Sequence, residues 1–258
     1  MGSWIRPNWA LAGACLFLMA AGARLAGREG APHWSYAGET GPARWGTLSE
    51  SYALCAGGRN QSPVDLTGAV IAPLPPLKFH YQPTDLDIVN NGHTIQVDYQ
   101  PGSYLSADGQ DYDLLQFHFH SPSEHTIDGL PYDMVAHLVH SNAGGELLVV
   151  AILMEAREEH SLVQTIWGHL PEEEGQRSLP AGVSINVMDF IPPMSSYFTY
   201  SGSLTTPPCT EGVRWIVLDT PVKVSVAQVE HFNSFFPRST RPLQPLNGRV
   251  IRKGVFSR

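Results

Sequence analysis

Two histidines separated by one residue, His118 and His120, are the part of this sequence best suited to metal chemistry. In a β-strand, alternate side chains share one face and lie about 6.6 Å apart along it. Both imidazoles would therefore project from one face, while Phe117 and Phe119 pack on the other. Two histidines placed in this way can supply two corners of a tetrahedron around Zn²⁺. The pair alone is a weak signal, because histidines on strands often serve only as hydrogen-bonding residues.

A third ligand should come from a neighbouring strand. The segment after the turn at residues 128–129 contains His137 and His140 and can fold back beside the first strand. Their odd separation puts these two on opposite faces, so either of them, but not both, is a candidate. Gln116 lies one step further along the His118 face, where its amide could hold a ligand imidazole in the right tautomer. Three neutral histidines would leave the fourth metal position open to water, as in a catalytic zinc site.

Short apolar runs separated by turn residues predict the strands that position these side chains. Helical periodicity is limited to residues 161–170 and 225–235, and Ser225 is a candidate N-cap for the second helix. The predicted strands cover residues 94–99, 114–120, 134–140, 147–153 and 213–218. We find no internal repeat, heptad pattern or low-complexity linker. The sequence therefore predicts one mostly-β (α+β) domain with a few short surface helices.

Composition limits the classes of partner. The chain has 258 residues, of which 43% are hydrophobic and 16% charged, enough to bury a substantial core. Its formal net charge is -8, and it has no run rich in lysine and arginine. Binding to nucleic acid or to an anionic lipid surface therefore gets no electrostatic support.

The first 23 residues have the features of a secretory signal peptide. Arg6 supplies a positive charge, residues 9–21 are apolar and uncharged, and residues 21–23 offer a small-x-small cleavage site. The alternative is an uncleaved membrane anchor, but the stretch is shorter than the roughly 20 residues of a spanning helix. Cleavage would leave Cys55 and Cys209, and an even pair in an oxidising compartment favours a disulfide over a catalytic thiol. We expect a secreted protein, periplasmic or extracellular, with a signal peptide at 1–23 and a folded domain at 24–258.

A series of motifs along the chain resembles the α-class carbonic anhydrases. The motifs run from about residue 33 to residue 250, nearly the whole of the expected mature chain. The short connection from His120 to His137 and the single cysteine pair resemble the bacterial branch. This resemblance implies a single domain around a large, central, mainly antiparallel twisted β-sheet. The motifs are HWSY at 33–36, NQSPVD at 60–65, NNGH at 90–93, QFHFH at 116–120, SEHT at 123–126, HLVH at 137–140, GSLTTPPC at 202–209 and RPLQPL at 241–246.

The resemblance also implies a reaction and its metal. By this likeness His118, His120 and His137 bind Zn²⁺, which lowers the pKa of its bound water, a chemistry for which carbonic anhydrase is itself the standard example. The resulting zinc hydroxide attacks CO₂ to give bicarbonate and a proton. Thr205 matches the threonine that accepts a hydrogen bond from the hydroxide and donates its own proton to a carboxylate, here Glu124. A hydroxyl can both donate and accept, whereas an ionised carboxylate only accepts.

Further positions match the proton path, the substrate wall and a disulfide. His93 matches the proton shuttle, since an ordinary pKa of about 6.5 suits exchange near pH 7, although it could simply end an Asn-Gly turn. Residues matched to the water-ordering path are Tyr36, Asn91 and Gln96. The apolar wall that holds CO₂ matches Val139, Val149, Leu204 and Trp215, with Thr206 beside the substrate, and the family's disulfide matches Cys55 and Cys209.

One position departs from the family pattern. The family usually carries Glu two residues before the third zinc histidine, where this chain has Val135. A valine cannot accept the hydrogen bond from the distal N–H of His137, and the surroundings of His125 and Tyr200 are expected to rearrange. The departure bears on zinc affinity more than on the reaction.

The substrates expected from the resemblance are CO₂ and bicarbonate, with sulfonamides and anions as inhibitors. A homodimer is compatible with the sequence, which neither requires nor excludes it. A secondary esterase activity at the same zinc is a second hypothesis for the enzyme. A third hypothesis, a non-catalytic binding protein, is disfavoured because all three histidines are present. No His-Glu-x-x-His motif occurs, which disfavours a metalloprotease.

Overall fold

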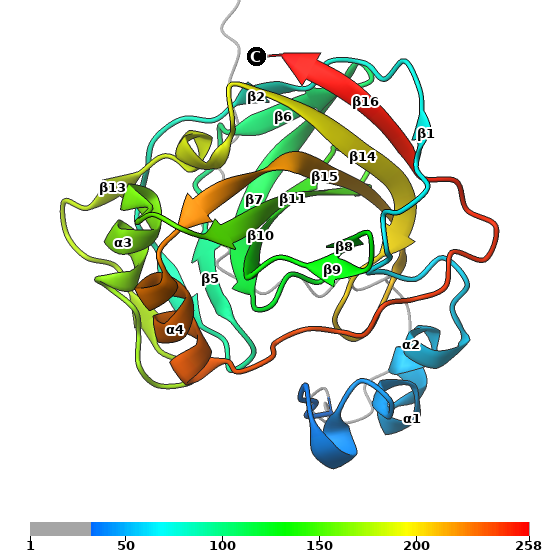
Figure 1. Ribbon diagram of the computed structural model, residues 1–258. Coiled ribbons are helices and arrows are strands. Elements are labelled where there is room, and N and C mark those ends of the chain that lie inside the picture. Colours follow the sequence, from blue (N-terminus) through cyan, green and yellow to red (C-terminus); the bar gives the residue numbers. More distant parts are fainter. Residues whose placement is uncertain (1–31, 258) are drawn as a thin grey trace, which may run out of the picture. The chain divides into compact units, whose positions relative to one another are not determined.

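A computed structural model describes residues 32–257 of the chain. The signal peptide expected at 1–23 lies outside the described residues. Within residues 32–257, twelve strands form one twisted sheet around which the rest of the chain is arranged (Figure 1). Its strands are β1 (Val70–Ile71), β2 (Lys78–His80), β4 (Ile88–Asn90), β5 (Ile95–Asp98), β6 (Tyr104–Ala107), β7 (Gln110–His120), β10 (Met134–Ser141), β11 (Leu147–Ala156), β12 (Arg177–Ser178), β14 (Met194–Ser203), β15 (Glu211–Val224) and β16 (Arg252–Ser257).

The smaller elements lie around this sheet. Two short antiparallel pairs join β3 (Thr84–Asp85) to β13 (Ser184–Ile185) and β8 (Thr126–Ile127) to β9 (Leu130–Pro131). The helices are α1 (Trp45–Leu48), α2 (Leu54–Gly57), α3 (Ser161–Trp167) and α4 (Val226–Phe235), with 3-10 turns at η1 (Gly38–Thr40), η2 (Glu50–Tyr52) and η3 (Val187–Phe190). None of these helices, within the described part of the chain, is long and apolar enough to cross a membrane.

The sheet confirms the predicted fold class. It differs from the prediction in one detail, since it contains both antiparallel and parallel strand pairs. Most neighbouring strands are antiparallel, but β11 pairs with β15, and β1 with β16, in parallel. A parallel pair needs a long crossover connection. The stretch between β11 and β15 supplies one, since it contains α3 and returns through β14, which pairs antiparallel with β15.

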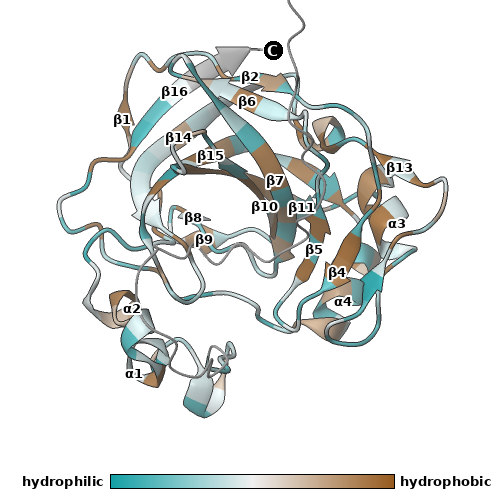
Figure 2. Cartoon of the chain, turned by 180° about the vertical axis from the view of Figure 1, so that it is seen from behind, coloured by the Kyte–Doolittle hydropathy of each residue, from teal (hydrophilic) through white to brown (hydrophobic). Residues whose placement is uncertain are grey.

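Side-chain alternation divides the central strands between two hydrophobic clusters. Phe117 and Phe119 are fully buried in the larger cluster, as the sequence predicts, with Phe190 in edge-on ring contact with both. The smaller cluster lies on the opposite face and contains Val149 and Trp215. Figure 2 shows hydrophobic residues following the central strands β10 and β11. The face that carries the smaller cluster is the one from which the zinc candidates project.

The two longer helices lie side by side at one side of the sheet (Figure 1). Ser225 is the N-cap of α4 and forms a capping box with Gln228, so the predicted start of this helix is confirmed. The indole of Trp167, at the end of α3, stacks on Phe232 at 5.9 Å and donates a hydrogen bond to the Gln228 carbonyl at 2.8 Å. Helix α3 ends at Trp167, before the predicted residue 170, and Gly168 occupies its C-cap position.

Candidate active site

The three candidate zinc ligands lie on two adjacent strands. In the antiparallel pair β7 and β10, His137 lies directly opposite His118, and His120 is one alternate position further along β7. One ring nitrogen from each of the three histidines lies within 4.8 Å of those of the other two. The register therefore brings together the trio that the resemblance implies.

His140 makes a different set of contacts. Its Nε2 lies 2.8 Å from the Tyr81 hydroxyl, and its Nδ1 lies 3.2 Å from the Leu148 carbonyl oxygen. Burial lowers the pKa of His140 to about 4, so the ring is neutral at physiological pH. Of the two histidines on β10, only His137 faces the pair on β7.

Hydrogen bonds on the outer nitrogens orient two of the rings. His118 Nδ1 lies 2.8 Å from the Gln116 amide oxygen, and His120 Nδ1 lies 2.6 Å from the Ser239 carbonyl oxygen. Because each acceptor requires a proton on Nδ1, the Nε2 atoms of both rings are free to face a metal. The Gln116 contact is the one proposed from sequence alternation.

The residues fit a zinc ion. His120 Nε2 is buried without a hydrogen-bond partner among the described residues, and a metal is the partner this position can take. Burial and the neighbouring imidazoles hold the pKa of His118 and His137 well below the ordinary value. Both rings are therefore neutral, as histidine ligands of a metal must be, and a set of three histidines is typical of a catalytic zinc site.

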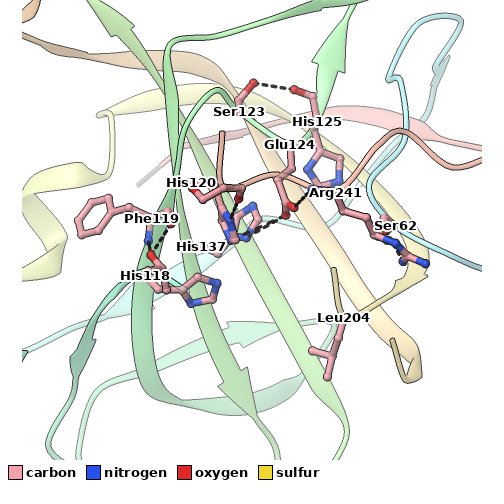
Figure 3. A network of polar contacts seen from close by, with 12 residues as sticks. Ser62, His118, Phe119, His120, Ser123, Glu124, His125, His137, Leu204 and Arg241 are labelled. Atoms are coloured by element: carbon pink, nitrogen blue, oxygen red, sulfur yellow. Dashed lines mark hydrogen bonds and ion pairs between the residues drawn. The ribbon is translucent and has the colours of Figure 1, made fainter. Parts of the chain in front are cut away.

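Glu124 is buried beside this cluster. Its Oε2 lies 3.8 Å from both His120 Nε2 and His137 Nδ1, and Figure 3 shows the carboxylate turned toward those rings. Its Oε1 accepts a hydrogen bond from the backbone N–H of Arg241 at 2.9 Å. Oε2 has no hydrogen-bond partner among the described residues, so the predicted bond from Thr205 is not formed here. The carboxylate nevertheless lies where a hydroxyl near the metal could reach it.

The segment that carries Thr205 is fixed at both ends. Trp215 Nε1 donates to the Ser203 carbonyl at 3.0 Å, and the Leu204 N–H donates to the Thr210 carbonyl at 2.9 Å. The Cys209 N–H donates to the Thr206 carbonyl at 2.9 Å. Thr205 itself is 5% exposed.

The predicted substrate wall forms one continuous surface. Val139 pairs with Val149 across β10 and β11, and Val149 pairs with Trp215 across β11 and β15. Leu204 packs against the same cluster from the Thr205 segment. The Trp215 ring lies 4.9 Å from the His137 ring, which places this apolar wall beside the histidine cluster.

The predicted proton-path residues are placed on both sides of the cluster. The Tyr36 ring lies 6.4 Å from His120, and its buried hydroxyl has no partner among the described residues. Asn91 Oδ1 accepts hydrogen bonds from the N–H groups of His93 and Thr94 at 3.0 and 2.9 Å. Gln96, opposite His118 in β5, donates to Asp98 at 2.6 Å.

Two contributors were not singled out from the sequence for the roles they play. Ser239 orients His120 through its backbone carbonyl, and Arg241 contacts Glu124 through its backbone N–H. A backbone carbonyl or N–H is the same whatever the residue type, so the sequence does not indicate which residues contribute one. The one available signal was that Arg241 begins the RPLQPL motif at 241–246.

Comparison with known proteins agrees with this geometry. A family model described as eukaryotic-type carbonic anhydrase matches residues 40–255. A carbonic anhydrase of Nostoc sp. is 45% identical over 228 residues, covering 86% of this chain and 86% of the relative.

The chain belongs to the eukaryotic-type, or α-class, carbonic anhydrase family.

Solved structures extend this family assignment to the fold. A hyperthermostable carbonic anhydrase from an active hydrothermal vent chimney superposes with a TM-score of 0.83 at 46% identity, over 86% of this chain and all (100%) of that one. A complex of the α-carbonic anhydrase of Thermovibrio ammonificans with sulfanilamide gives a TM-score of 0.83 at 42% identity, with 86% and 100% coverage. Members of the family are zinc enzymes, and zinc is accordingly the cofactor of this carbonic anhydrase.

The valine that departs from the family pattern has a visible consequence in this carbonic anhydrase. Val135 is fully buried, on the same face of β10 as His137. His137 Nε2 and His125 Nδ1 are both buried and have no hydrogen-bond partner among the described residues. The His125 ring keeps its other contact, since its Nε2 lies 2.7 Å from the Tyr200 hydroxyl. One side-chain replacement thus accompanies two unpaired imidazole nitrogens.

We expect Val135→Glu to slow zinc loss. A carboxylate at residue 135 could accept from His137 Nε2 and hold that ring on the metal, and such contacts typically change metal affinity about 10- to 100-fold. Competition dialysis of both proteins against one chelator measures the effect, with a smaller change expected in turnover. Val135→Met, which adds bulk without a strong acceptor, is the matched control.

The opposing factor is burial. A glutamate in a pocket packed around valine is a desolvated charge, which destabilises the fold unless its hydrogen bonds form. A folded Val135→Glu protein that releases zinc as fast as Val135→Met would refute the hydrogen-bond argument.

Proposed function

We propose that this carbonic anhydrase hydrates CO₂ reversibly to bicarbonate and a proton at a zinc ion held by His118, His120 and His137. The observation that carries the proposal is the convergence of three imidazoles beside both a buried carboxylate and an apolar wall. When bound, zinc lowers the pKa of a coordinated water and so supplies a nucleophile near neutral pH.

Thr205 and Glu124 select and orient what occupies the open metal position. Glu124 is held by the Arg241 N–H and has one oxygen without a partner, which is available to accept from the Thr205 hydroxyl. Once that hydroxyl donates to Glu124, its oxygen can only accept. The pair therefore favours groups that can donate a proton, and it orients them for attack.

The apolar wall binds CO₂, with Val139, Val149, Leu204 and Trp215 against the linear molecule and Thr206 at its edge. CO₂ has no net dipole, so a dry, shaped surface serves it better than hydrogen bonds. His93 transfers the product proton to buffer, along waters ordered by Tyr36, Asn91 and Gln96. Sulfonamides and anions would inhibit by competing for the position beside the three histidines, where the N–H of a sulfonamide could donate to Thr205.

We further infer that residues 24–258 form the catalytic domain of an exported protein, periplasmic or extracellular, after removal of residues 1–23. The Cys55–Cys209 disulfide supports an oxidising location. The N-terminus of the mature protein, determined by sequencing, tests the cleavage site.

Zinc content per chain, measured together with CO₂ hydration, tests the proposed function. One zinc per chain with activity lost on chelation and restored by zinc is the expected result. Full CO₂ hydration by the metal-free protein would end the proposal. Ester hydrolysis on the same preparation tests the second candidate, which we expect as a minor activity that follows the metal.

His93→Ala is expected to lower kcat while leaving kcat/KM nearly unchanged. The reason is that proton export limits turnover, whereas attack on CO₂ precedes it. Stopped-flow hydration in dilute buffer measures both, and small imidazole buffers should restore part of the lost kcat. Equal falls in both parameters, insensitive to buffer, would indicate a structural role for this turn residue.

A further inference from the structure

The side chain of Glu174 lies against the turn that carries His93. A β-carbon placed on Gly92 would lie 2.5 Å from both Cδ and Oε1 of Glu174, so the carboxylate occupies the space that any other residue at 92 would need. Gly92 also has a φ of +81°, which glycine adopts without strain. The glycine at position 92 therefore leaves room for this carboxylate beside the turn that carries His93.

The loop that carries Glu174 is fastened to the end of β4. The Gly175 N–H donates to the Asn90 carbonyl at 2.7 Å, and the Asn90 N–H donates to the Gln176 carbonyl at 3.0 Å. The Asn90 amide nitrogen donates to the Pro171 carbonyl at 3.3 Å. These bonds bracket Glu174 in the sequence, so its backbone position is fixed even though its side chain is exposed.

His93 is held at the same place by an aromatic ring. Its imidazole stacks on Trp34 with ring centroids 3.7 Å apart and planes 11° from parallel. Its other ring contact in the described part of the chain is His33, at 6.4 Å. Burial lowers the pKa of His93, Glu174 raises it and His33 lowers it, so the two charged or titratable groups that act on His93 oppose each other.

We propose that Glu174 is a positioning residue for His93, whose carboxylate holds the imidazolium at the Trp34-stacked position from which the proton passes to buffer. The proposal rests on the shuttle role given to His93 above. Attraction across an exposed surface is modest, roughly half a pH unit in a pKa. A shift of this size changes the ratio of charged to neutral His93 about threefold at a given pH.

The test is the titration of the His93 imidazole by NMR in the zinc-loaded enzyme, with His93→Ala to assign the signal. In Glu174→Gln the midpoint should fall by about half a pH unit, because the acid form loses its counter-charge. The pH profile of kcat should move to lower pH by the same amount. Glu172→Gln, which removes an equal charge from an exposed position of the same loop, should change neither. Glu174→Asp should keep part of the wild-type midpoint.

Two results would overturn the proposal. An unchanged His93 midpoint in Glu174→Gln would show that the carboxylate does not act on the ring. An equal shift in Glu172→Gln would show that the overall negative charge of the loop, and not Glu174 in particular, acts on His93. Failure of the shuttle role gives a different result. In that case His93→Ala would keep the wild-type kcat in dilute buffer, while the NMR titration would still decide whether Glu174 and His93 interact.

Discussion

We expect His118→Ala to remove bound zinc and CO₂ hydration together. His118 provides one of three ligand nitrogens within 4.8 Å of one another, and two histidines cannot complete a tetrahedral three-nitrogen set. The variant should fold, because His118 is only partly buried and its neighbours Phe117 and Phe119 supply the core contacts. The zinc content per chain and the stopped-flow rate of CO₂ hydration should both fall to background. The metal-free variant and the metal-free wild-type protein should have nearly equal melting temperatures.

His231→Ala is the matched control, since His231 is an exposed histidine on α4 in contact with Phe235. It should keep one zinc per chain and full activity. A His118→Ala protein that retained stoichiometric zinc and measurable hydration would show that the metal is held elsewhere, and the assignment of the centre would fail.

Strand alternation is a local rule, so it predicts the His118–His120 pair, whereas His137 comes from the family resemblance. Residues 118 and 120 share a face whatever the rest of the chain does, and Phe117 and Phe119 do pack in the opposite core. The choice between His137 and His140 was a different matter. It depends on how β10 pairs with β7, which places His137 opposite His118, and alternation within one strand does not set that register.

What the sequence could not predict is carried by backbone groups and by long-range topology. The carbonyl of Ser239 and the N–H of Arg241 reach the site from the far end of the chain, and either could belong to any residue type. The parallel pairing of β11 with β15 depends on where the crossover returns, which periodicity does not encode. Glu174 lies beside His93 only because its loop binds the end of β4.

The disulfide is the other feature whose removal should have a large effect. Cys55 and Cys209 are bonded as the resemblance implies, across a sequence separation of 154 residues. In the chain-entropy model, closing a loop of that length reduces the entropy of the unfolded chain and so stabilises the folded state by roughly 5 kcal/mol at most. For a domain of this size that corresponds to a fall in melting temperature on the order of 10–20 °C.

We therefore expect Cys55→Ser/Cys209→Ser to melt at a much lower temperature while keeping CO₂ hydration at 25 °C. The Thr205 segment stays bound to the sheet through Trp215, and Gln61 Nε2 donates to the Cys209 carbonyl at 3.0 Å, so the site does not depend on the covalent bond alone.

Because Cys209 is fully buried, a serine there also buries a hydroxyl. The Cys55→Ala/Cys209→Ala pair separates that cost from loop entropy, and reduction of the wild-type protein should give the same fall. Two thiols titrating in the native protein would show that the bond does not form. A large loss of activity well below the melting point would show that the disulfide positions Thr205 directly.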